Sequence, residues 1–231
     1  MVVIPALDEE STIGAVVRGL PRDRVAAIVV VDNGSRDHTA EVAREAGAVV
    51  VSETERGYGA ACLAGLAWCR REGPPRLVAF VDADGSDEPG DLTRLWAALD
   101  DPQDDDDLAD LVIGARREAE SGALLPAQRF GNLLATTLLR LQTGVRFSDL
   151  GPFRAIRWEA LERLAMSDRN YGWTVEMQLK AARAGLRCRE IPVAYRKRRG
   201  GRSKVAGTLR GTFGAGHKIL STLARHALWR P

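Results

Sequence analysis

The chain has 231 residues, of which 45% are hydrophobic and 28% are charged, a composition that excludes intrinsic disorder and a collagen-like fibre. A chain of this length buries roughly 70% of its unfolded surface, so it forms a core without metal or disulfide staples. The three cysteines have no metal-ligand spacing and cannot all pair, which argues against a disulfide framework and predicts a cytoplasmic location.

The net charge of +2 is divided unevenly along the chain. Residues 195–231 contain ten Lys and Arg and no Asp or Glu, which leaves 23 basic and 31 acidic residues in residues 1–194. A basic end attracts anions, and composition leaves nucleic acid, anionic lipid and a phosphorylated substrate open as partners. We expect neither a signal peptide nor a membrane span, because no stretch has the apolar length that either requires.

Short β-branched runs alternate with segments of helical period in the first half of the chain, a pattern typical of parallel βαβ units. Strands are predicted at 2–4, 27–31, 48–51, 77–81 and 111–114, and helices at 9–20, 37–46, 58–70 and 89–99. Further helices are predicted at 126–141 and 174–184, and further strands at 153–156 and 188–195. We therefore expect an α/β fold with a mostly parallel central sheet flanked by helices on both faces.

Local signals refine these elements. Asp37 is the predicted N-cap of the second helix, and Pro89 is expected in the first turn of the fourth. Six aspartates in residues 100–107 predict a solvated loop. From residue 207, apolar residues recur at helical spacing among basic ones, which predicts an amphipathic helix that glycines weaken and that needs a partner surface.

Acidic side chains follow three of the predicted strands, at the sheet edge where ligands bind in open α/β folds. Residues 8–10 are all acidic after the first strand, Asp32 follows the second, and Asp82 and Asp84 follow the fourth. Two carboxylates one residue apart repel each other unless a cation lies between them. Because Mg²⁺ and Mn²⁺ favour carboxylate and phosphate oxygens, Asp82 and Asp84 are the predicted metal ligands.

Seven short motifs follow one another in order along the chain. They are Ile4-Pro5-Ala6-Leu7-Asp8-Glu9, Val31-Asp32-Asn33-Gly34-Ser35-Arg36-Asp37-His38-Thr39, Arg56-Gly57-Tyr58-Gly59-Ala60-Ala61, Asp82-Ala83-Asp84-Gly85, Gly114-Ala115-Arg116, Asp149-Leu150-Gly151-Pro152-Phe153-Arg154 and Arg198-Arg199-Gly200-Gly201-Arg202-Ser203-Lys204. Together they resemble the family-2 glycosyltransferases with the GT-A (Rossmann-like) fold. The resemblance is greatest to the polyprenyl-phosphate (dolichyl-phosphate) mannose and glucose synthases.

The resemblance implies how the donor nucleotide is bound. Asp32 accepts a hydrogen bond from the base, and the base and ribose are lined by Pro5, Ala6, Leu7 and Glu9. Uracil and guanine both offer a ring N–H to a carboxylate, so UDP-glucose and GDP-mannose both stay open as donors.

The resemblance also implies the residues of the reaction centre. Asp82, Ala83 and Asp84 meet the donor diphosphate, with Asp84 as the more direct ligand of Mg²⁺ or Mn²⁺. The implied catalytic residues are Asp84 and a second carboxylate, Asp149. An Asp before Leu-Gly-Pro also forms turns, so a purely structural role for Asp149 stays open. Glu176 is a further acid that either contacts the acceptor or serves a helix terminus.

Phosphate contacts are implied for a third set of residues, which comprises Arg116, Arg129, Arg198, Ser203 and Lys204. Arginine forks suit phosphate oxygens. A phosphate acceptor is ionised at pH 7 and attacks the anomeric carbon without a strong base, so Asp149 would position groups rather than deprotonate one. Two departures affect the acceptor more than the donor: Tyr58 replaces a frequent Lys, and Gly151-Pro152 replaces the usual Ser/Thr-Gly.

We therefore expect a metal-dependent hexosyltransferase, with a GT-A domain at residues 1–204 and a basic amphipathic helix at 205–231. A lipid-phosphate acceptor and peripheral contact with the cytoplasmic membrane face are expected, nucleic acid is not, and the oligomeric state is open. One alternative is a soluble or protein-linked acceptor with Asp149 or Glu176 as the base. Others are a sugar-nucleotide pyrophosphorylase and an inactive RNA- or membrane-binding module. Gly57-x-Gly59 lacks the third glycine of a dinucleotide site, so NAD is not expected.

Overall fold

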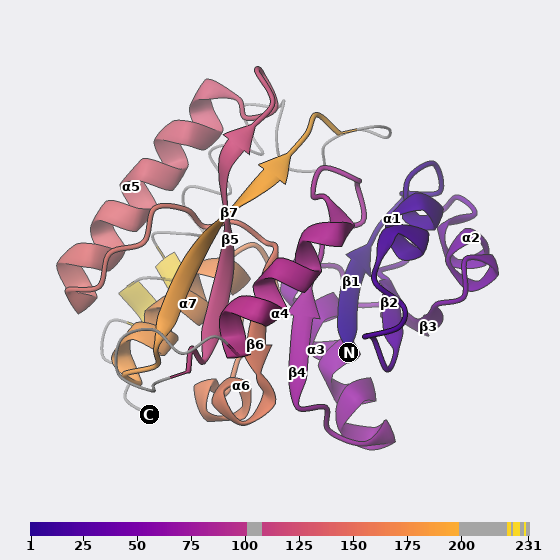
Figure 1. The fold of residues 1–231 in the computed structure, drawn as a ribbon, viewed down its shortest axis with the longest axis horizontal. Helices are drawn as coiled ribbons and strands as arrows, with labels where there is room; N and C mark the ends of the chain where they lie inside the picture. The colour runs from indigo at the N-terminus through magenta and orange to yellow at the C-terminus, as the bar shows by residue number, and fades with distance from the viewer. Residues whose placement is uncertain (101–107, 199–220, 223, 227–228, 230–231) are drawn as a thin grey trace.

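The computed structural model describes residues 1–100, 108–198, 221–222, 224–226 and 229, which form a seven-stranded sheet with helices on both faces (Figure 1). The strand order is β3-β2-β1-β4-β6-β5-β7. β6 runs antiparallel to β4 and β5, and the other neighbouring strands are parallel. The predicted α/β fold with a mostly parallel sheet is therefore confirmed. The strands are β1 (Val2–Ala6), β2 (Ile28–Asp32), β3 (Val49–Ser52), β4 (Leu77–Phe80), β5 (Leu111–Ala119), β6 (Arg154–Arg157) and β7 (Cys188–Tyr195).

The helices divide between the two faces of the sheet. One apolar cluster contains residues of α1, α2 and α4, and the other contains residues of α3, α5, α6 and α7. In Figure 1, α5 lies on the β7 side of the molecule, far from β3. The helices are α1 (Ile13–Gly19), α2 (Thr39–Glu45), α3 (Tyr58–Glu72), α4 (Leu92–Asp100), α5 (Pro126–Thr143), α6 (Trp158–Leu164) and α7 (Trp173–Arg183), and a 3₁₀ turn at Pro89–Asp91 precedes α4.

Alternate residues of the central strands enter opposite cores. Val29 and Val31 join the cluster under α3, whereas Ile28 and Val30 join the cluster under α1 and α2. Successive side chains of a strand point to opposite faces, so a strand covered on both sides must be apolar throughout. This is the physical origin of the unbroken apolar runs in the sequence.

The starts of α1 and α2 differ from the prediction. α1 begins at Ile13 rather than at residue 9, because the chain first makes a turn closed by a hydrogen bond from the Ile13 amide to the Glu9 carbonyl (2.9 Å). α2 begins at Thr39 with His38 as its N-cap, so the predicted cap at Asp37 was wrong by one position. The Asp37 carboxylate still accepts the Thr39 amide (3.0 Å), and it therefore satisfies one amide of the first turn.

Two further differences concern β5 and α6. β5 was expected to end at residue 114, but it continues to Ala119 because it pairs with β7, with a register shift between Ala115 and Glu118. α6 has no counterpart among the predicted elements, since it begins directly after β6 without a turn residue that would separate a strand from a helix.

Parts of the C-terminal segment pack on this domain. Thr222 is 1% exposed, and its hydroxyl lies 3.3 Å from the Asp168 carboxylate. The Lys180 ammonium lies 5.1 Å from the ring centre of Trp229. Most of the helix predicted from residue 207, and most of the loop predicted at 100–107, lie outside the described residues.

Cys62 and Cys69 are buried free thiols, and Cys188 is a partly exposed one. Burial raises the pKa of the Cys62 thiol well above its ordinary value, so this group stays protonated and apolar at neutral pH. Within the described parts of the chain, none of the helices has both the length and the apolar character needed to cross a bilayer.

Gly59 allows the loop before α7 to lie directly against the first turn of α3. The Gly59 amide donates to the Asn170 carbonyl (3.3 Å), and the Ala60 amide donates to the Arg169 carbonyl (2.9 Å). A Cβ at Gly59 would lie 1.9 Å from the Asp168 carbonyl oxygen. These amides bond to the chain itself, which gives the glycine of this Gly-x-Gly pattern a role in the contact between the loop and α3.

Gly59→Ala should lower the free energy of unfolding by about 2 kcal/mol or more, because the added methyl group overlaps backbone that cannot rotate away. Urea unfolding followed by circular dichroism measures this loss. Gly131→Ala in α5 is the matched control, since a Cβ there meets nothing within 4 Å. The control should keep the wild-type stability or gain up to ~1 kcal/mol. Wild-type stability of Gly59→Ala would contradict the close approach of the loop.

Candidate active site

Three carboxylates gather just beyond the carboxyl end of β4. Asp84 and Asp87 are 8% and 4% exposed, and Asp82 is half-buried. The Asp82 amide donates to the Asp87 carboxylate (3.5 Å), and the Ser86 amide donates to the Asp84 carboxylate (2.9 Å). These bonds fold the chain into a tight turn that concentrates negative charge. Asp87 was not among the predicted site residues, although its place five positions after Asp82 in the same turn is a usable signal.

Burial and mutual repulsion disfavour full ionisation of this acidic cluster. Burial raises the pKa of Asp82 to about 7, and the charge of Asp84 adds to the effect. Burial, with the charges of Asp82 and Asp84, also raises the pKa of Asp87 well above its ordinary value. The positive charges of Arg116 and Arg198 act in the opposite direction on Asp82. A cation bound here would therefore relieve a real electrostatic cost.

Arg198 supplies one positive charge to these acids. Its guanidinium lies 3.0 Å from the Asp84 carboxylate and 2.8 Å from the Glu9 carboxylate, and the side chain is 25% exposed. The residue thus links the segment after β7 to the acidic ends of β1 and β4. To bind a substrate phosphate, as the resemblance implies, this guanidinium must leave or share its two carboxylates.

The acidic cluster fits a hard divalent cation. Among the described residues, Oδ1 of Asp82 and Oδ1 of Asp87 are buried without a hydrogen-bond partner. Buried polar atoms in native proteins are normally paired, and carboxylate oxygens are the ligands that Mg²⁺ and Mn²⁺ prefer. A complete metal site made by three or more His, Cys, Asp or Glu side chains is not found anywhere among the residues that the structure describes. One or two carboxylates would therefore share the ion with substrate phosphate and water.

The predicted nucleotide residues line the same edge of the sheet. Ala6 and Asp32 are register partners at the ends of β1 and β2, next to β4. Asp32 is half-buried and accepts the Ser35 amide (3.0 Å). Ala6 is buried, whereas Pro5 and Leu7 are partly exposed. The structure therefore brings the residues implied for the base and ribose beside the residues implied for the diphosphate.

Two polar links hold this edge together. The Thr12 hydroxyl donates to the Ala83 carbonyl (2.8 Å), which ties the start of α1 to the acidic turn. The Asn33 side-chain amide donates to the carbonyls of Glu53 (3.0 Å) and Glu55 (2.7 Å), which ties β2 to the segment after β3. Asn33 thus serves the scaffold, and Ala83 contributes backbone rather than side chain.

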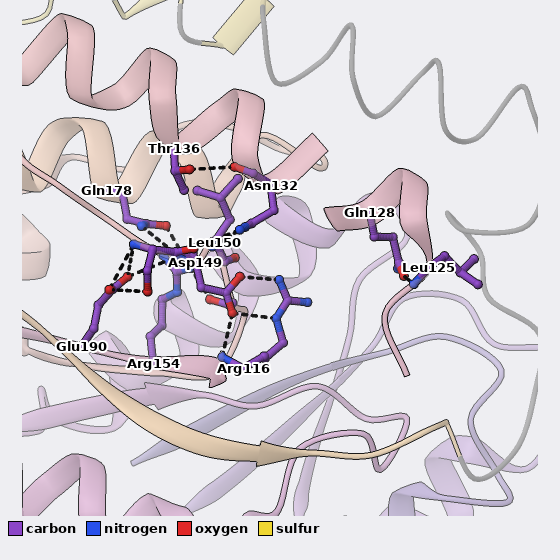
Figure 2. Close-up of polar contacts among 12 residues, drawn as sticks. Arg116, Leu125, Gln128, Asn132, Thr136, Asp149, Leu150, Arg154, Gln178 and Glu190 are labelled. Carbon is purple, nitrogen blue, oxygen red and sulfur yellow. Dashed lines mark hydrogen bonds and ion pairs between the residues drawn. The ribbon is translucent and has the colours of Figure 1, made fainter. Parts of the chain in front are cut away.

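Asp149 and Arg116 form a buried ion pair with two contact points (Figure 2). Arg116 Nε lies 2.8 Å from Oδ2 and Nη2 lies 2.6 Å from Oδ1, and the Arg116 amide also donates to Oδ2 (2.8 Å). Burial alone would raise the pKa of Asp149, but the hydrogen bonds and charge of Arg116 outweigh it, so the pKa lies below its ordinary value. Asp149 is thus an ionised carboxylate that holds Arg116, and it is a poor proton acceptor.

The loop that carries Asp149 is held from three sides (Figure 2). Glu190 of β7 accepts the Asp149 amide (3.1 Å), and Gln178 of α7 donates to the Asp149 carbonyl (3.0 Å). Arg154 of β6 is fully buried and donates to the Leu150 carbonyl (3.3 Å). Burial lowers the pKa of Arg154 to about 10, so it keeps its charge at neutral pH. Glu190 and Gln178 were not predicted, because only their polarity within apolar elements marks them in the sequence.

A cavity of about 190 Å³ adjoins this ion pair. Arg116 of β5, the neighbouring Arg117 and Arg129 of α5 all line it. Guanidinium groups suit an anion with several oxygens, such as a phosphate, so a cavity lined by three arginines is suited to such a ligand. Two of the residues implied at phosphates, Arg116 and Arg129, therefore meet here, whereas Ser203 and Lys204 lie outside the described residues.

Glu176 lies in the interior, where it cannot meet a substrate. It is fully buried, and its carboxylate accepts the Ser167 hydroxyl (2.7 Å) and the Asp168 amide (2.7 Å) and pairs with the Lys180 ammonium (2.7 Å). The suggested roles as acceptor contact or catalytic base are therefore wrong for Glu176. Trp173 beside it is 1% exposed, and it belongs to the core.

Asp149→Asn should lower the free energy of unfolding by about 3 kcal/mol at neutral pH, because the buried Arg116 charge loses its partner. The folded-state pKa of Asp149 lies below its ordinary value of 3.8, so the pair stabilises the fold above that value and ceases to do so as the pH falls through the folded-state pKa. Urea unfolding across this range should give a constant difference at neutral and mildly acidic pH that shrinks in strong acid. Asp110→Asn removes a more exposed pair with Arg187, and as the control it should cost less than about 1 kcal/mol. A difference that grows in acid would contradict the assignment.

Comparison with known proteins agrees with this geometry. Residues 1–165 match the family model described as Glycosyl transferase family 2. The chain is 42% identical to an uncharacterized glycosyltransferase of Mycobacterium tuberculosis over 213 residues, a match that covers 92% of this chain and 92% of that protein. It is 32% identical to the undecaprenyl-phosphate mannosyltransferase of Micrococcus luteus, over 91% of this chain and 89% of that protein. It is also 32% identical to the polyprenol monophosphomannose synthase of Mycolicibacterium smegmatis, over 90% and 81%.

A solved structure has the same fold. The crystal structure of glucosyl-3-phosphoglycerate synthase from Mycobacterium tuberculosis, in complex with Mn²⁺, UDP and phosphoglyceric acid, matches with a TM-score of 0.78. The match covers 100% of this chain and 78% of that chain at 23% identity. This likeness supports the GT-A architecture of the sheet and its helices. The chain is therefore a glycosyltransferase that belongs to glycosyl transferase family 2 and has the GT-A fold.

Proposed function

We propose that this glycosyltransferase moves a hexose from a nucleoside-diphosphate sugar to a polyprenyl phosphate. One observation carries the proposal: the acidic cluster of Asp82, Asp84 and Asp87 follows β4, and Arg116 of the cavity lies toward the carboxyl end of β5. Both strands run antiparallel to β6, so these ends lie at the same edge of the sheet, and the charge of Arg116 acts on Asp82. The acids suit a cation-bound diphosphate, and the arginines suit a second phosphate. The names of the two relatives that are 32% identical, an undecaprenyl-phosphate mannosyltransferase and a polyprenol monophosphomannose synthase, support a lipid-phosphate acceptor.

The donor nucleotide lies along the ends of β1 and β2. Asp32 accepts a hydrogen bond from a ring N–H of the base, and Pro5 and Leu7 contact the base and ribose with their partly exposed surfaces. The preferred donors are UDP-glucose and GDP-mannose, because uracil and guanine both present such a donor group. Glu9 faces this edge through its contact with Arg198.

Asp82 and Asp84 hold Mg²⁺ or Mn²⁺ in this proposal, with the Ala83 backbone between them. The bound ion neutralises charge on the departing diphosphate. Complexes of the solved neighbour with Mn²⁺ or Mg²⁺ and UDP support this choice of metal. Arg198 contacts Asp84, and it would be available to the donor phosphates if the Asp84 carboxylate bound the ion.

The acceptor phosphate occupies the arginine cavity. Arg116 and Arg129 bind its oxygens, and one oxygen attacks the anomeric carbon while the nucleoside diphosphate leaves from the opposite side. A single displacement of this kind inverts the anomeric carbon. The phosphate is already ionised at neutral pH, so no side chain needs to remove a proton. Asp149 keeps Arg116 in place for this step.

A soluble acceptor with a hydroxyl nucleophile is the second candidate, favoured by the phosphoglyceric acid bound to the solved neighbour. A hydroxyl group needs a general base within hydrogen-bond reach. Asp149 is engaged by Arg116, and Glu176 is buried away from the cavity. This observation favours the phosphate acceptor. Membership of a glycosyltransferase family also argues against the pyrophosphorylase and the inactive binding module.

The site of action is the cytoplasmic face of the membrane, where a lipid-linked phosphate is present. In this proposal the basic side chains within residues 205–231 contact anionic headgroups, and each Lys or Arg near such a surface contributes ~1 kcal/mol. Ser203 and Lys204 meet a substrate phosphate in this proposal. Nucleic acid is not a partner in this proposal, since an acidic sheet edge repels a polyanion.

The donor and the metal are tested together by thermal shift. UDP-glucose or GDP-mannose with Mn²⁺ should raise the melting temperature of the wild type by about 5–10 °C at saturation, because the ligand binds only the folded state. Asp84→Asn should abolish this shift and reduce transfer roughly 100-fold or more. Asp110→Asn, at the opposite end of β5, is the control and should keep both. A full shift in Asp84→Asn would end the metal assignment.

The acceptor is tested by kinetics with polyprenyl phosphate. Arg129→Gln should raise the KM for this acceptor about 10-fold, because a charged hydrogen bond contributes about 1.5–3 kcal/mol, and should leave donor binding unchanged. Arg44→Gln on the exposed surface of α2 is the control. Turnover that does not respond to polyprenyl phosphate, together with an intact donor-induced thermal shift, would reject the lipid acceptor and keep the glycosyltransferase assignment.

A further inference from the structure

Helix α5 presents an apolar face to solvent. Phe130 is 68% exposed, Leu133 64%, Leu134 39% and Leu141 77%. We call these four residues the α5 face. Among the described residues, the large hydrophobic side chains with more than half of their surface exposed all belong to this face. Burying such a face is favourable, so its exposure marks a contact surface.

Helical geometry places these residues on one side of α5. Positions 130, 134 and 141 fall within a narrow sector of a helix with 3.6 residues per turn, and 133 lies beside them. The opposite side is buried: Ala135 and Leu139 are both 0% exposed and join the core with α7. α5 is therefore apolar on two sides, of which one packs against the core and the other is exposed.

The charged side chains of α5 itself are all positive. α5 contains no Asp or Glu between residues 126 and 143, and its two charged residues are Arg129 and Arg140. These arginines are three helical turns apart, so both lie along the same flank of the α5 face, and both are exposed. An apolar stripe bordered by arginines is the pattern of a helix that lies in a membrane interface, with the arginines at headgroup level.

The α5 face is continuous with the arginine cavity. Arg129 lines that cavity, and Asn132 reaches from the next turn to the loop of Asp149, where it accepts the Leu150 amide (2.8 Å) and donates to the Ser148 carbonyl (3.0 Å) (Figure 2). α5 therefore joins an apolar surface to the place proposed for a phosphate, in one rigid element.

We propose that the α5 face lies on a bilayer that contains anionic lipids, with Arg129 and Arg140 among the headgroups. A lipid-linked phosphate then enters the cavity from the bilayer while its chain stays among the lipids. The entry route rests on the proposed acceptor, whereas the membrane contact rests on α5 alone. The partner is a lipid surface because the flank is purely basic and the stripe is apolar; a basic surface for nucleic acid has no need of exposed phenylalanine and leucine.

The test is co-sedimentation of the full chain with vesicles of phosphatidylcholine alone or mixed with phosphatidylglycerol, without donor or acceptor. The wild type should bind the mixed vesicles, and part of this binding should persist at high salt because the apolar contact is not screened. Leu133→Ser/Leu141→Ser should weaken the binding that persists at high salt by about 10-fold or more. Val49→Ser, a partly exposed apolar residue on β3 at the other edge of the sheet, is the matched control and should bind as the wild type does.

Circular dichroism melting and the thermal shift with donor and Mn²⁺ should be the same for the double variant as for the wild type, which excludes misfolding. Equal vesicle binding by the double variant and the wild type would overturn the proposal. Light scattering that finds a dimer broken by the double variant, with vesicle binding unchanged, would also overturn it and identify the α5 face as a contact between two copies. Vesicle binding through α5 without stimulation by polyprenyl phosphate would reject the acceptor and keep the membrane contact.

Discussion

The carboxylates of the acidic cluster at the end of β4 repel one another, and positive charges placed around them reduce this repulsion. Asp82, Asp84 and Asp87 are held together by a tight turn in partly buried surroundings, where like charges repel more strongly than in water. Part of this positive charge comes from Arg198 in the segment after β7, and part comes from Arg116 of β5. A divalent ion would supply more of this charge, and it would allow an acidic sheet edge to bind an anionic diphosphate.

Each arginine near the cluster is in turn held by a second acid. Glu9 holds Arg198, and Asp149 holds Arg116 through two side-chain contacts. The second arrangement has a chemical consequence. A carboxylate that is fully engaged by a guanidinium remains ionised, so it orients a positive charge instead of accepting a proton. A site with that property works by placing charges, and it is suited to a nucleophile that is already ionised, such as a phosphate.

α5 connects this electrostatic arrangement to the surface of the molecule. One flank carries Arg129 into the cavity, one side packs on the core, and the remaining side is apolar and exposed. A lipid phosphate has the same division, with a charged head and an apolar chain. Asn132 fixes α5 to the residues on either side of Asp149, so the helix and the ion pair belong to one connected arrangement.

The amino-acid sequence by itself determined the order of strands and helices apart from α6, the acids at three strand ends and the glycosyltransferase resemblance, because these depend on local periodicity and short motifs. The predicted bounds of β7 match the structure, as do the starts of α3 and α5. Only the tertiary structure decided the antiparallel direction of β6, the partner of Asp149 and the interior place of Glu176. The physical reason is that such properties arise from contacts between distant positions: Arg116 lies 33 residues before the carboxylate it pairs with, and no local pattern encodes that meeting.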